Sequence, residues 1–246
     1  MTGTGSTTPA STDWPDQLSF PEQTQVMAGP HDMVNMYLSH HAFRRDLRQF
    51  ESAVRGTPVG EAACWAALAE RWEVFSFVLH HHHTIEDVKM WPVLVQHAEE
   101  DGDEAAVAVL HAMEAEHDLI DPALAACADG FATMVTHPCD DHRNALDVHV
   151  TTARELLADH LRHEETEAIG LIQRLMTVQE WADAEAYAGK GVSLGQVAAL
   201  VPWSVHGLAA DLRARVVGDS PLAFRVVLRL FDRRFQRRER VAFRYA

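Results

Sequence analysis

The sequence is short of cysteine, of long apolar runs and of leader-like segments, and each shortage excludes a class of protein. Three cysteines in 246 residues (Cys64, Cys127 and Cys139) are too few and too widely spaced for a disulfide framework, and they fit a reducing cytoplasm. No window approaches 18 uninterrupted apolar residues, which argues against a transmembrane segment. Residues 1–28 lack the basic and apolar regions of a signal peptide. We therefore expect a cytoplasmic protein.

Lysine is nearly absent, so arginine supplies almost all of the positive charge, and it does so unevenly. Residues 213–246 hold ten arginines and three acidic residues, a net charge of +7 in a chain whose total is −15. The residues before them therefore carry −22. We expect this basic C-terminal part to dock on the acidic body of its own chain or on a partner. An anionic membrane surface is an alternative, and the negative total charge disfavours nucleic acid.

Signals that end helices are sparse, and no strand-like alternation of apolar and polar residues appears. Four segments rich in Ala, Leu, Glu and Arg remain between them, and they predict an all-α protein. With short connections, the segments predict an antiparallel up-down-up-down four-helix bundle. The predicted helices cover residues 31–55, 61–98, 103–129 and 140–177.

Three regions follow from this pattern. Residues 1–29 are rich in Thr, Ser, Pro and Gly, which predicts a disordered arm. Residues 30–178 make the bundle, and residues 179–246 make a helical extension that ends in a basic helix. Thr177 and Glu180 predict a capping box, and Ser220 followed by Pro221 predicts the start of the last helix.

Histidine is the residue type in excess, with sixteen copies. Each predicted bundle helix carries an apolar stripe at helical spacing, and each stripe is interrupted by one histidine. Two of these stripes also contain a glutamate one helical turn after the histidine, so both side chains point the same way. The interrupting residues are His40, His82, Glu86, His117, His160 and Glu164. His41 lies off the stripe beside several arginines and is expected to face water.

The six residues repeat along the chain. His40 precedes His82 by 42 residues, His117 precedes His160 by 43, and a glutamate follows each second histidine at four residues. In an antiparallel bundle this symmetry brings all six side chains to one level of the core. Buried carboxylates are costly unless they are paired or bound to metal. A metal satisfies every group at once, although a salt-bridge network of glutamates and protonated histidines remains an alternative.

Mixed imidazole and carboxylate ligands suit iron, manganese or zinc rather than calcium or magnesium. Six ligands exceed the needs of one tetrahedral zinc. They suit two metal ions, each held by two histidines and bridged by two glutamates, with coordination positions left open for a small ligand. The sequence shows neither a Gly-x-Ser-x-Gly nucleophile motif nor a phosphate-binding loop.

With these residues in place, the sequence resembles the hemerythrin-like, HHE cation-binding family over about residues 31 to 177. The segments that carry the resemblance are Ser39–Arg45, His82 to Glu86 running on to Pro92, Met113–His117 and His160–Glu165. The resemblance implies a four-helix bundle with a non-haem di-iron centre, oxo- or hydroxo-bridged, whose ligands are the six residues above. Members of the family bind O₂ reversibly or sense oxygen, iron or redox state, and some relatives handle peroxide or nitric oxide.

The sequence departs from the O₂-carrying pattern at one position. The family's fifth histidine, four residues before the one in the third helix, is replaced here by Met113, and a thioether is a poor ligand for ferric iron. Glu114 lies three residues before His117, the spacing used in carboxylate di-iron bundles, and is the candidate substitute, the alternative being an ordinary solvated carboxylate. His83 and Tyr37 flank the site. A more open centre favours redox turnover or sensing over stable O₂ carriage, which leaves a peroxide- or nitric-oxide-converting enzyme and an iron- or redox-responsive interaction protein as alternatives.

Overall fold

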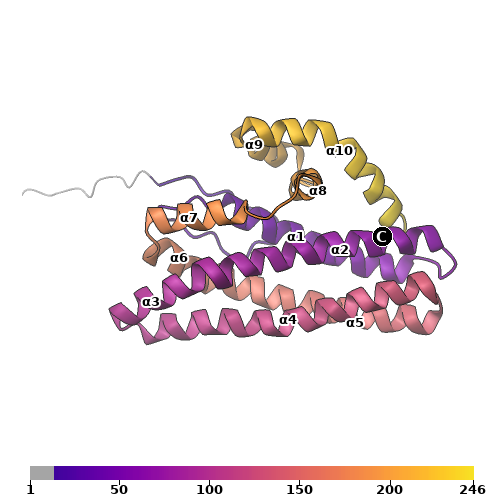
Figure 1. Cartoon of the computed structure of the whole chain (residues 1–246), viewed down its shortest axis with the longest axis horizontal. Coiled ribbons are helices and arrows are strands. Elements are labelled where there is room, and N and C mark those ends of the chain that lie inside the picture. Colours follow the sequence, from indigo (N-terminus) through magenta and orange to yellow (C-terminus); the bar gives the residue numbers. More distant parts are fainter. Residues whose placement is uncertain (1–13) are drawn as a thin grey trace, which may run out of the picture.

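The computed structural model describes residues 14–246, which form a helical protein without a strand in that range (Figure 1). Two short π-helical turns, η1 and η2, interrupt otherwise regular helices. The elements are α1 (Val34–Gly56), α2 (Ala62–Ile85), η1 (Glu86–Met90), α3 (Trp91–Asp101), α4 (Glu104–Thr136), α5 (Asp140–His163), η2 (Glu164–Ala168), α6 (Ile169–Leu175), α7 (Val178–Ala188), α8 (Leu194–Ser204), α9 (Ala210–Asp219) and α10 (Leu222–Ala242).

The long helices α1, α2, α4 and α5 lie side by side along the long axis and form a helical bundle (Figure 1). α1 packs on α5, α2 packs on α4, and α4 packs on α5. Their buried apolar side chains form two clusters, one around Phe50, Trp72 and Phe131 and the other around Met33 and Leu110. Along each bundle helix, the stripe histidine lies close to the position where residues of one cluster give way to residues of the other. A polar layer therefore separates two apolar halves of the core.

α4 is the one described helix whose length and composition would allow it to cross a membrane. It packs against α2, α3 and α5, and its buried face carries His117. These contacts are those of a bundle helix.

Two expected helix ends are displaced. The segment expected at 61–98 continues to Asp101, with η1 inside it and Pro92 in the first turn of α3, where a missing N–H costs little. α4 runs through Gly130 to Thr136, beyond its expected end at residue 129. A Cβ on Gly130 would lie 2.7 Å from the Leu146 side chain, so this glycine permits close packing of α4 on α5 and is not a helix stop.

The C-terminal capping predictions had different outcomes. Thr177 and Glu180 form the predicted capping box at the start of α7. Ser220, by contrast, donates its hydroxyl to the carbonyl of Val216 on the preceding helix, and Pro221 occupies the N-cap position of α10. A serine hydroxyl has both options, and sequence alone does not distinguish them.

The N-terminal segment differs from the expected disordered arm from residue 14 onward, whereas residues 1–13 of that arm lie outside the described part. Leu18 and Phe20 are buried against the bundle. The side chain of Gln17 donates to the carbonyl of His31, and the Thr24 N–H donates to Glu165. This segment also covers His41, which is 7% exposed instead of facing water.

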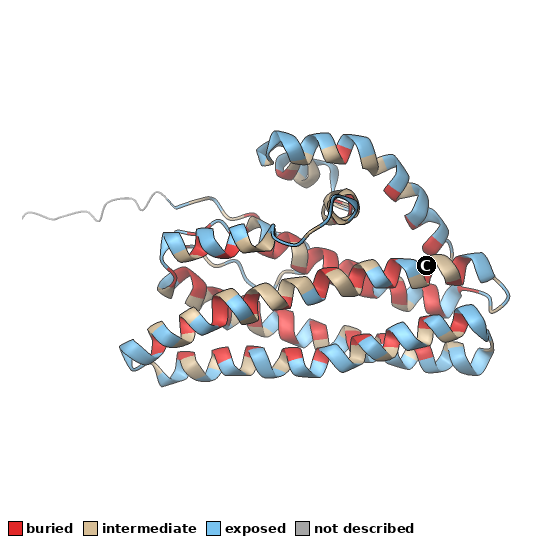
Figure 2. Cartoon of the chain, in the orientation of Figure 1, coloured by how far each residue is buried: buried red, intermediate tan, exposed pale blue. Residues whose placement is uncertain are grey.

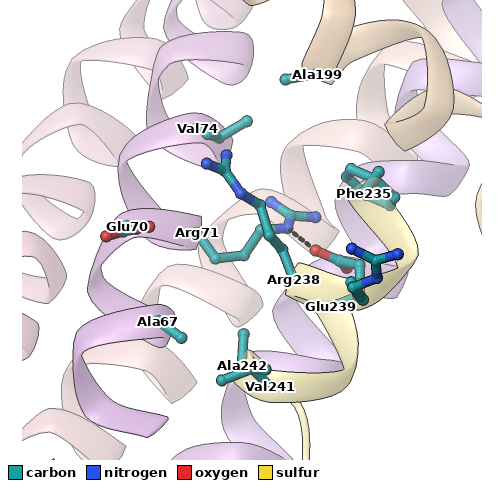
Figure 3. A pocket seen from close by; sticks show the side chains of 11 residues that line it. Ala67, Glu70, Arg71, Val74, Ala199, Phe235, Arg238, Glu239, Val241 and Ala242 are labelled. Atoms are coloured by element: carbon teal, nitrogen blue, oxygen red, sulfur yellow. Dashed lines mark hydrogen bonds and ion pairs between the residues drawn. The ribbon is translucent and has the colours of Figure 1, made fainter. Parts of the chain in front are cut away.

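The C-terminal helices α8 to α10 lie on one side of the bundle, and α10 packs on α2 and α8 (Figures 1 and 2). Buried charges anchor this part. Arg71 of α2 donates to Glu239 of α10 at 2.7 Å (Figure 3) and also to Asp46 of α1. Asp46 in turn accepts from the Trp203 indole of α8 at 2.7 Å and from Arg45. We refer to these five residues as the anchor cluster.

Candidate metal centre

All six stripe residues converge in the polar layer of the bundle. Five of them are at most 4% exposed, and the His82 side chain is 12% exposed. Their ligand-type atoms fall into two groups, in each of which the atoms lie within 4.8 Å of one another. One group contains His40, His82, Glu86 and Glu164, and the other contains His83, Glu86, His117 and His160. Because Glu86 belongs to both, the arrangement has two adjoining centres.

The first group brings together residues from four elements, α1, α2, η1 and η2. The His40 Nε2 atom lies 3.1 Å from Glu164 Oε2, and the His82 Nε2 atom lies 3.0 Å from Glu86 Oε1. The rings of His40 and His82 meet edge to face with centroids 5.3 Å apart. Phe43 packs on His82 at 5.3 Å and closes the apolar side of this group.

The second group contains three histidines. His117 Nε2 lies 3.2 Å from His160 Nε2, and 3.5 Å from Glu86 Oε2. The ring of His83 stacks on that of His117 with centroids 3.9 Å apart and an interplanar angle of 9°. His83 is 2% exposed, and neither of its ring nitrogens has a hydrogen-bond partner among the described residues.

Orphaned polar atoms test whether these residues fit a metal. Nitrogens of three histidines and all four carboxylate oxygens of Glu86 and Glu164 are buried and make no hydrogen bond of good geometry in the described part of the chain. Buried polar groups are ordinarily paired, and an unpaired one costs about 1 to 3 kcal/mol. Such a concentration of unpaired acceptors at one level fits cations placed between them.

Three carboxylates outside the groups orient the histidines. His40 donates its Nδ1–H to Glu165 at 3.0 Å, His117 donates to Asp87 at 2.8 Å, and His160 donates to Glu116 at 2.9 Å. With the Nδ1 atom so held, the Nε2 atom of each ring faces the centre and is the atom that would bind a metal. Glu165 is held in turn by Arg44, whose guanidinium donates two hydrogen bonds of 2.7 and 3.0 Å.

Each of the two glutamates of the site stands at a break in helical geometry. Glu86 opens the π-helical turn η1, and Glu164 opens the π-helical turn η2. A π turn inserts one residue into an α-helix and is frequent at functional sites. The two turns correspond in the sequence repeat, so the structural irregularity repeats together with the ligand pattern.

The pKa values of the site groups reflect burial and mutual charge. Burial and the neighbouring Glu164 raise the pKa of Glu86, whereas the charge of His40 outweighs burial and lowers the pKa of Glu164. Burial and the positive charge of His40 lower the pKa of His82 to about 3, and burial also lowers that of His83. Although burial opposes it, the charge of Glu164 raises the pKa of His40 to about 9, so a metal that binds here displaces a proton from this imidazole.

Other candidates do not join the centre. Glu114, the candidate substitute for the fifth histidine, points away on the exposed side of α4, and its side chain is 66% exposed and 4.0 Å from His111. Tyr37 is buried but uses its hydroxyl to accept the N–H of Met27. The position left by Met113 is instead matched by His83, which reaches the second group from α2.

Sequence reasoning under-rated His83 and missed the orienting carboxylates. His83 follows His82 directly, about 100° around the helix from the stripe, so a stripe pattern does not select it. Asp87 and Glu165 each follow a glutamate of the site by one residue, which is a repeat visible in the sequence. Their roles are not visible there, because Asp87 supports a histidine on α4 and Glu165 one on α1.

A small cavity of about 170 Å³ reaches the first group from outside the bundle. It is bordered by His82 and Glu86 on one side and by Trp181, Ala184 and Glu185 of α7 on the other. Its size suits a small molecule rather than a bulky substrate.

Comparisons with known proteins agree with this geometry. Residues 32–172, more than half of the chain, match the family described as hemerythrin HHE cation binding domain. Among curated proteins and among solved structures, nothing matches the chain.

Proposed function

Because the chain belongs to the hemerythrin HHE cation binding domain family, we propose that it is a non-haem di-iron protein that binds or senses O₂ or a related small redox ligand. The observation that carries this proposal is the pair of adjoining ligand groups that share Glu86. In this proposal the core is an antiparallel up-down-up-down four-helix bundle. The three free cysteines support a cytoplasmic location.

The ligands divide unequally between the two irons. His40 and His82 would hold one iron and His83, His117 and His160 the other, with Glu86 and Glu164 as the carboxylate ligands of the centre. Five histidines are then available, so the replacement at Met113 no longer argues against reversible O₂ binding. The cavity beside His82 lies on the side of the group with two histidines, and a small exogenous ligand would reach that iron through it.

When bound, two ferrous ions supply one electron each to a small oxidant. The protein's own contribution is to orient the ligating histidines and to exclude water from the centre. Glu165, Asp87 and Glu116 hold the protons at the Nδ1 atoms, which keeps the ligating rings in place. The centre is walled on one side by apolar residues that are each at most 1% exposed: Phe43, Phe75, Leu79 and Leu157.

The test is the optical spectrum of the anaerobically reduced, iron-loaded protein during repeated cycles of O₂ addition and removal. Reversible formation of a stable oxygenated spectrum supports binding. Rapid O₂ evolution from added peroxide, lost in Glu164→Ala, would instead identify a peroxide-decomposing enzyme. A spectrum that does not respond to O₂, nitric oxide or peroxide would contradict the proposal.

A sensing role is favoured by one specific path of contacts. The ring of His82 packs on Phe43, and Phe43 packs on Trp203 of α8 with centroids 5.5 Å apart. Trp203 donates to Asp46 in the anchor cluster. A change at this iron therefore has a direct route of packed side chains to the C-terminal helices. Ligand-dependent tryptophan fluorescence that is lost in Trp203→Phe, with unchanged iron content, is the expected sign of this coupling.

A further inference from the structure

α10 has two faces of different character. Its inner face packs on the rest of the chain through Leu228, Phe235 and Ala242 and through the Glu239–Arg71 ion pair. Its outer face is exposed and forms one edge of the molecule (Figure 2). Three aliphatic side chains stand on that outer face at successive four-residue steps: Leu222 is 69% exposed, Val226 47% and Leu230 66%.

Arginines occur along the whole of α10, and Arg225, Arg229 and Arg233 flank these aliphatic side chains on the outer face. The seven arginines of α10 are all exposed, and none of them lies in an ion pair with another described residue. They are Arg225, Arg229, Arg233, Arg234, Arg237, Arg238 and Arg240. The two acidic residues of α10 are already engaged, Asp232 with Arg213 and Glu239 with Arg71. α10 therefore docks on the bundle by its apolar face, and the acidic body does not neutralise the arginine side.

Charge and apolarity together define what fits this outer face. Unpaired arginines attract an anionic surface, and each basic residue beside an anionic bilayer raises the affinity about fivefold. Nucleic acid would satisfy the arginines through its phosphates but would leave Leu222, Val226 and Leu230 without a partner. A bilayer satisfies both, because the aliphatic side chains enter the boundary between headgroups and acyl chains while arginines remain at the phosphates.

We propose that the outer face of α10 binds the surface of an anionic phospholipid bilayer, with Leu222, Val226 and Leu230 inserted and the arginines at the lipid phosphates. The helix lies in the plane of the surface and does not cross it. The bundle, with its negative charge, is then held outside the headgroup layer, and the metal centre is carried at the membrane without taking part in the contact.

The test is co-sedimentation of the full-length chain with phosphatidylcholine vesicles, either pure or containing one part of phosphatidylglycerol to two of phosphatidylcholine. We expect binding to the anionic vesicles, none to the neutral ones, and a loss of binding as salt rises from about 0.1 M to about 1 M. The triple variant Arg225→Gln/Arg229→Gln/Arg233→Gln is expected to bind on the order of a hundredfold more weakly.

Variants of the three aliphatic residues distinguish binding to a lipid surface from binding to other anions. Leu222→Ser/Val226→Ser/Leu230→Ser is expected to lose vesicle binding while its melting temperature and metal content stay unchanged. The matched control, Leu119→Ser/Val148→Ser, changes similarly exposed aliphatic residues on α4 and α5 (61% and 64% exposed) and is expected to bind as the unaltered chain does. Equal binding by the α10 serine variant, tighter binding to a short DNA duplex than to the vesicles, or no vesicle binding would each overturn the proposal.

Discussion

At the scale of single residues, His83 decides the composition of the metal centre. It is buried, its ring lies against His117, and its two nitrogens have no other partner among the described residues. In the internal repeat its counterpart is Leu161, so the two halves of the centre differ at this position. In the proposed di-iron centre, the group that contains His83 would therefore have three histidines and the other group two.

His83→Ala is therefore expected to reduce iron content from two to about one per chain, because the second group loses one of its three imidazoles. Elemental analysis of the purified variant measures this directly. Glu114→Ala, which changes the exposed glutamate of α4, is the matched control and is expected to keep both irons. Iron loss in the Glu114 variant with full iron in the His83 variant would reverse the assignment.

Residue-scale prediction from sequence succeeds where helical periodicity applies. All six stripe residues follow from interruptions of apolar stripes, and the repeated His-x-x-x-Glu spacing relates Glu86 to Glu164. His83 and the orienting carboxylates Asp87, Glu116 and Glu165 are placed by contacts between helices. Such contacts depend on which faces of two helices meet, and the sequence of one helix does not show which residues of its neighbour it contacts.

At the scale of elements, the two π turns link the ligand pattern to the path of the chain. Each turn begins at a glutamate of the site, so each long helix makes a one-residue offset at the level of the centre. The offset lets the residues before and after the turn keep buried faces toward the same core, for example Leu79 in α2 and Leu94 in α3. A period-based prediction assumes uninterrupted helix, and so it missed both turns.

Deletion of Val88 tests the importance of η1. Because a π turn absorbs one inserted residue, removing one residue restores α-helical geometry and leaves the buried Trp91 and Leu94 facing the core. The deletion instead changes the direction in which Glu86 and Asp87 project from the turn. We expect loss of iron with little change in stability to urea. Val88→Ala keeps the residue count at a site that is 50% exposed, and it is expected to retain the iron. A deletion variant with full iron content would show that the π turn is dispensable.

At the scale of the whole molecule, the C-terminal helices are an integral part of the bundle. Phe235, Ala242 and Trp203 belong to the same buried cluster as Phe50 and Trp72. The anchor cluster adds buried charges that join α1, α2, α8 and α10. Deletion of residues 212–246 would therefore expose core residues, and point substitutions are the better test of this region.

Asp46→Asn removes the carboxylate on which the anchor cluster depends. Arg45 and Arg71 outweigh the effect of burial and lower the pKa of Asp46, so the group is charged in the folded protein. Without it, the buried guanidinium group of Arg45 loses its counter-charge and that of Arg71 keeps only Glu239, and the free energy of unfolding is expected to fall by about 3 to 5 kcal/mol. Urea denaturation measures the change. Asp118→Asn, at an exposed position of α4, is the control, and equal stabilities for the two variants would contradict the role of the cluster.

Low pH is expected to lower the free energy of unfolding through a histidine beside the anchor cluster. Burial and the charge of Arg45 lower the pKa of His206 from 6.5 to about 4, so between these pH values the unfolded chain binds a proton that the folded chain does not. The free energy of unfolding therefore falls as pH drops below 6.5. Between about pH 7 and about pH 5 the His206 contribution is about 1 to 2 kcal/mol after allowance for its partial exposure. His206→Gln is expected to show a smaller loss over this interval, and an identical loss would exclude the histidine as the cause.

The whole-molecule arrangement is the level least accessible from sequence. The helical composition and the bundle region can be predicted from the residues that end helices and from the periodicity of the apolar residues. The buried charges Arg71, Asp46 and Glu239 look like ordinary surface charges in the sequence, because only their partners on other helices distinguish them. The ordered path of residues 14–33 was missed for the same reason, since hydrogen bonds to distant residues such as Glu165 outweigh a loop-like composition.

The function proposed for this chain depends above all on two adjoining ligand groups, which share Glu86, holding two irons. Elemental analysis of the purified chain, together with its optical spectrum under air, measures this occupancy without an assumption about the physiological ligand. We expect two irons per chain with the absorption of bridged ferric ions, and loss of both in Glu164→Ala. A single zinc per chain, or a metal-free protein that is equally stable with and without added iron, would contradict the di-iron assignment.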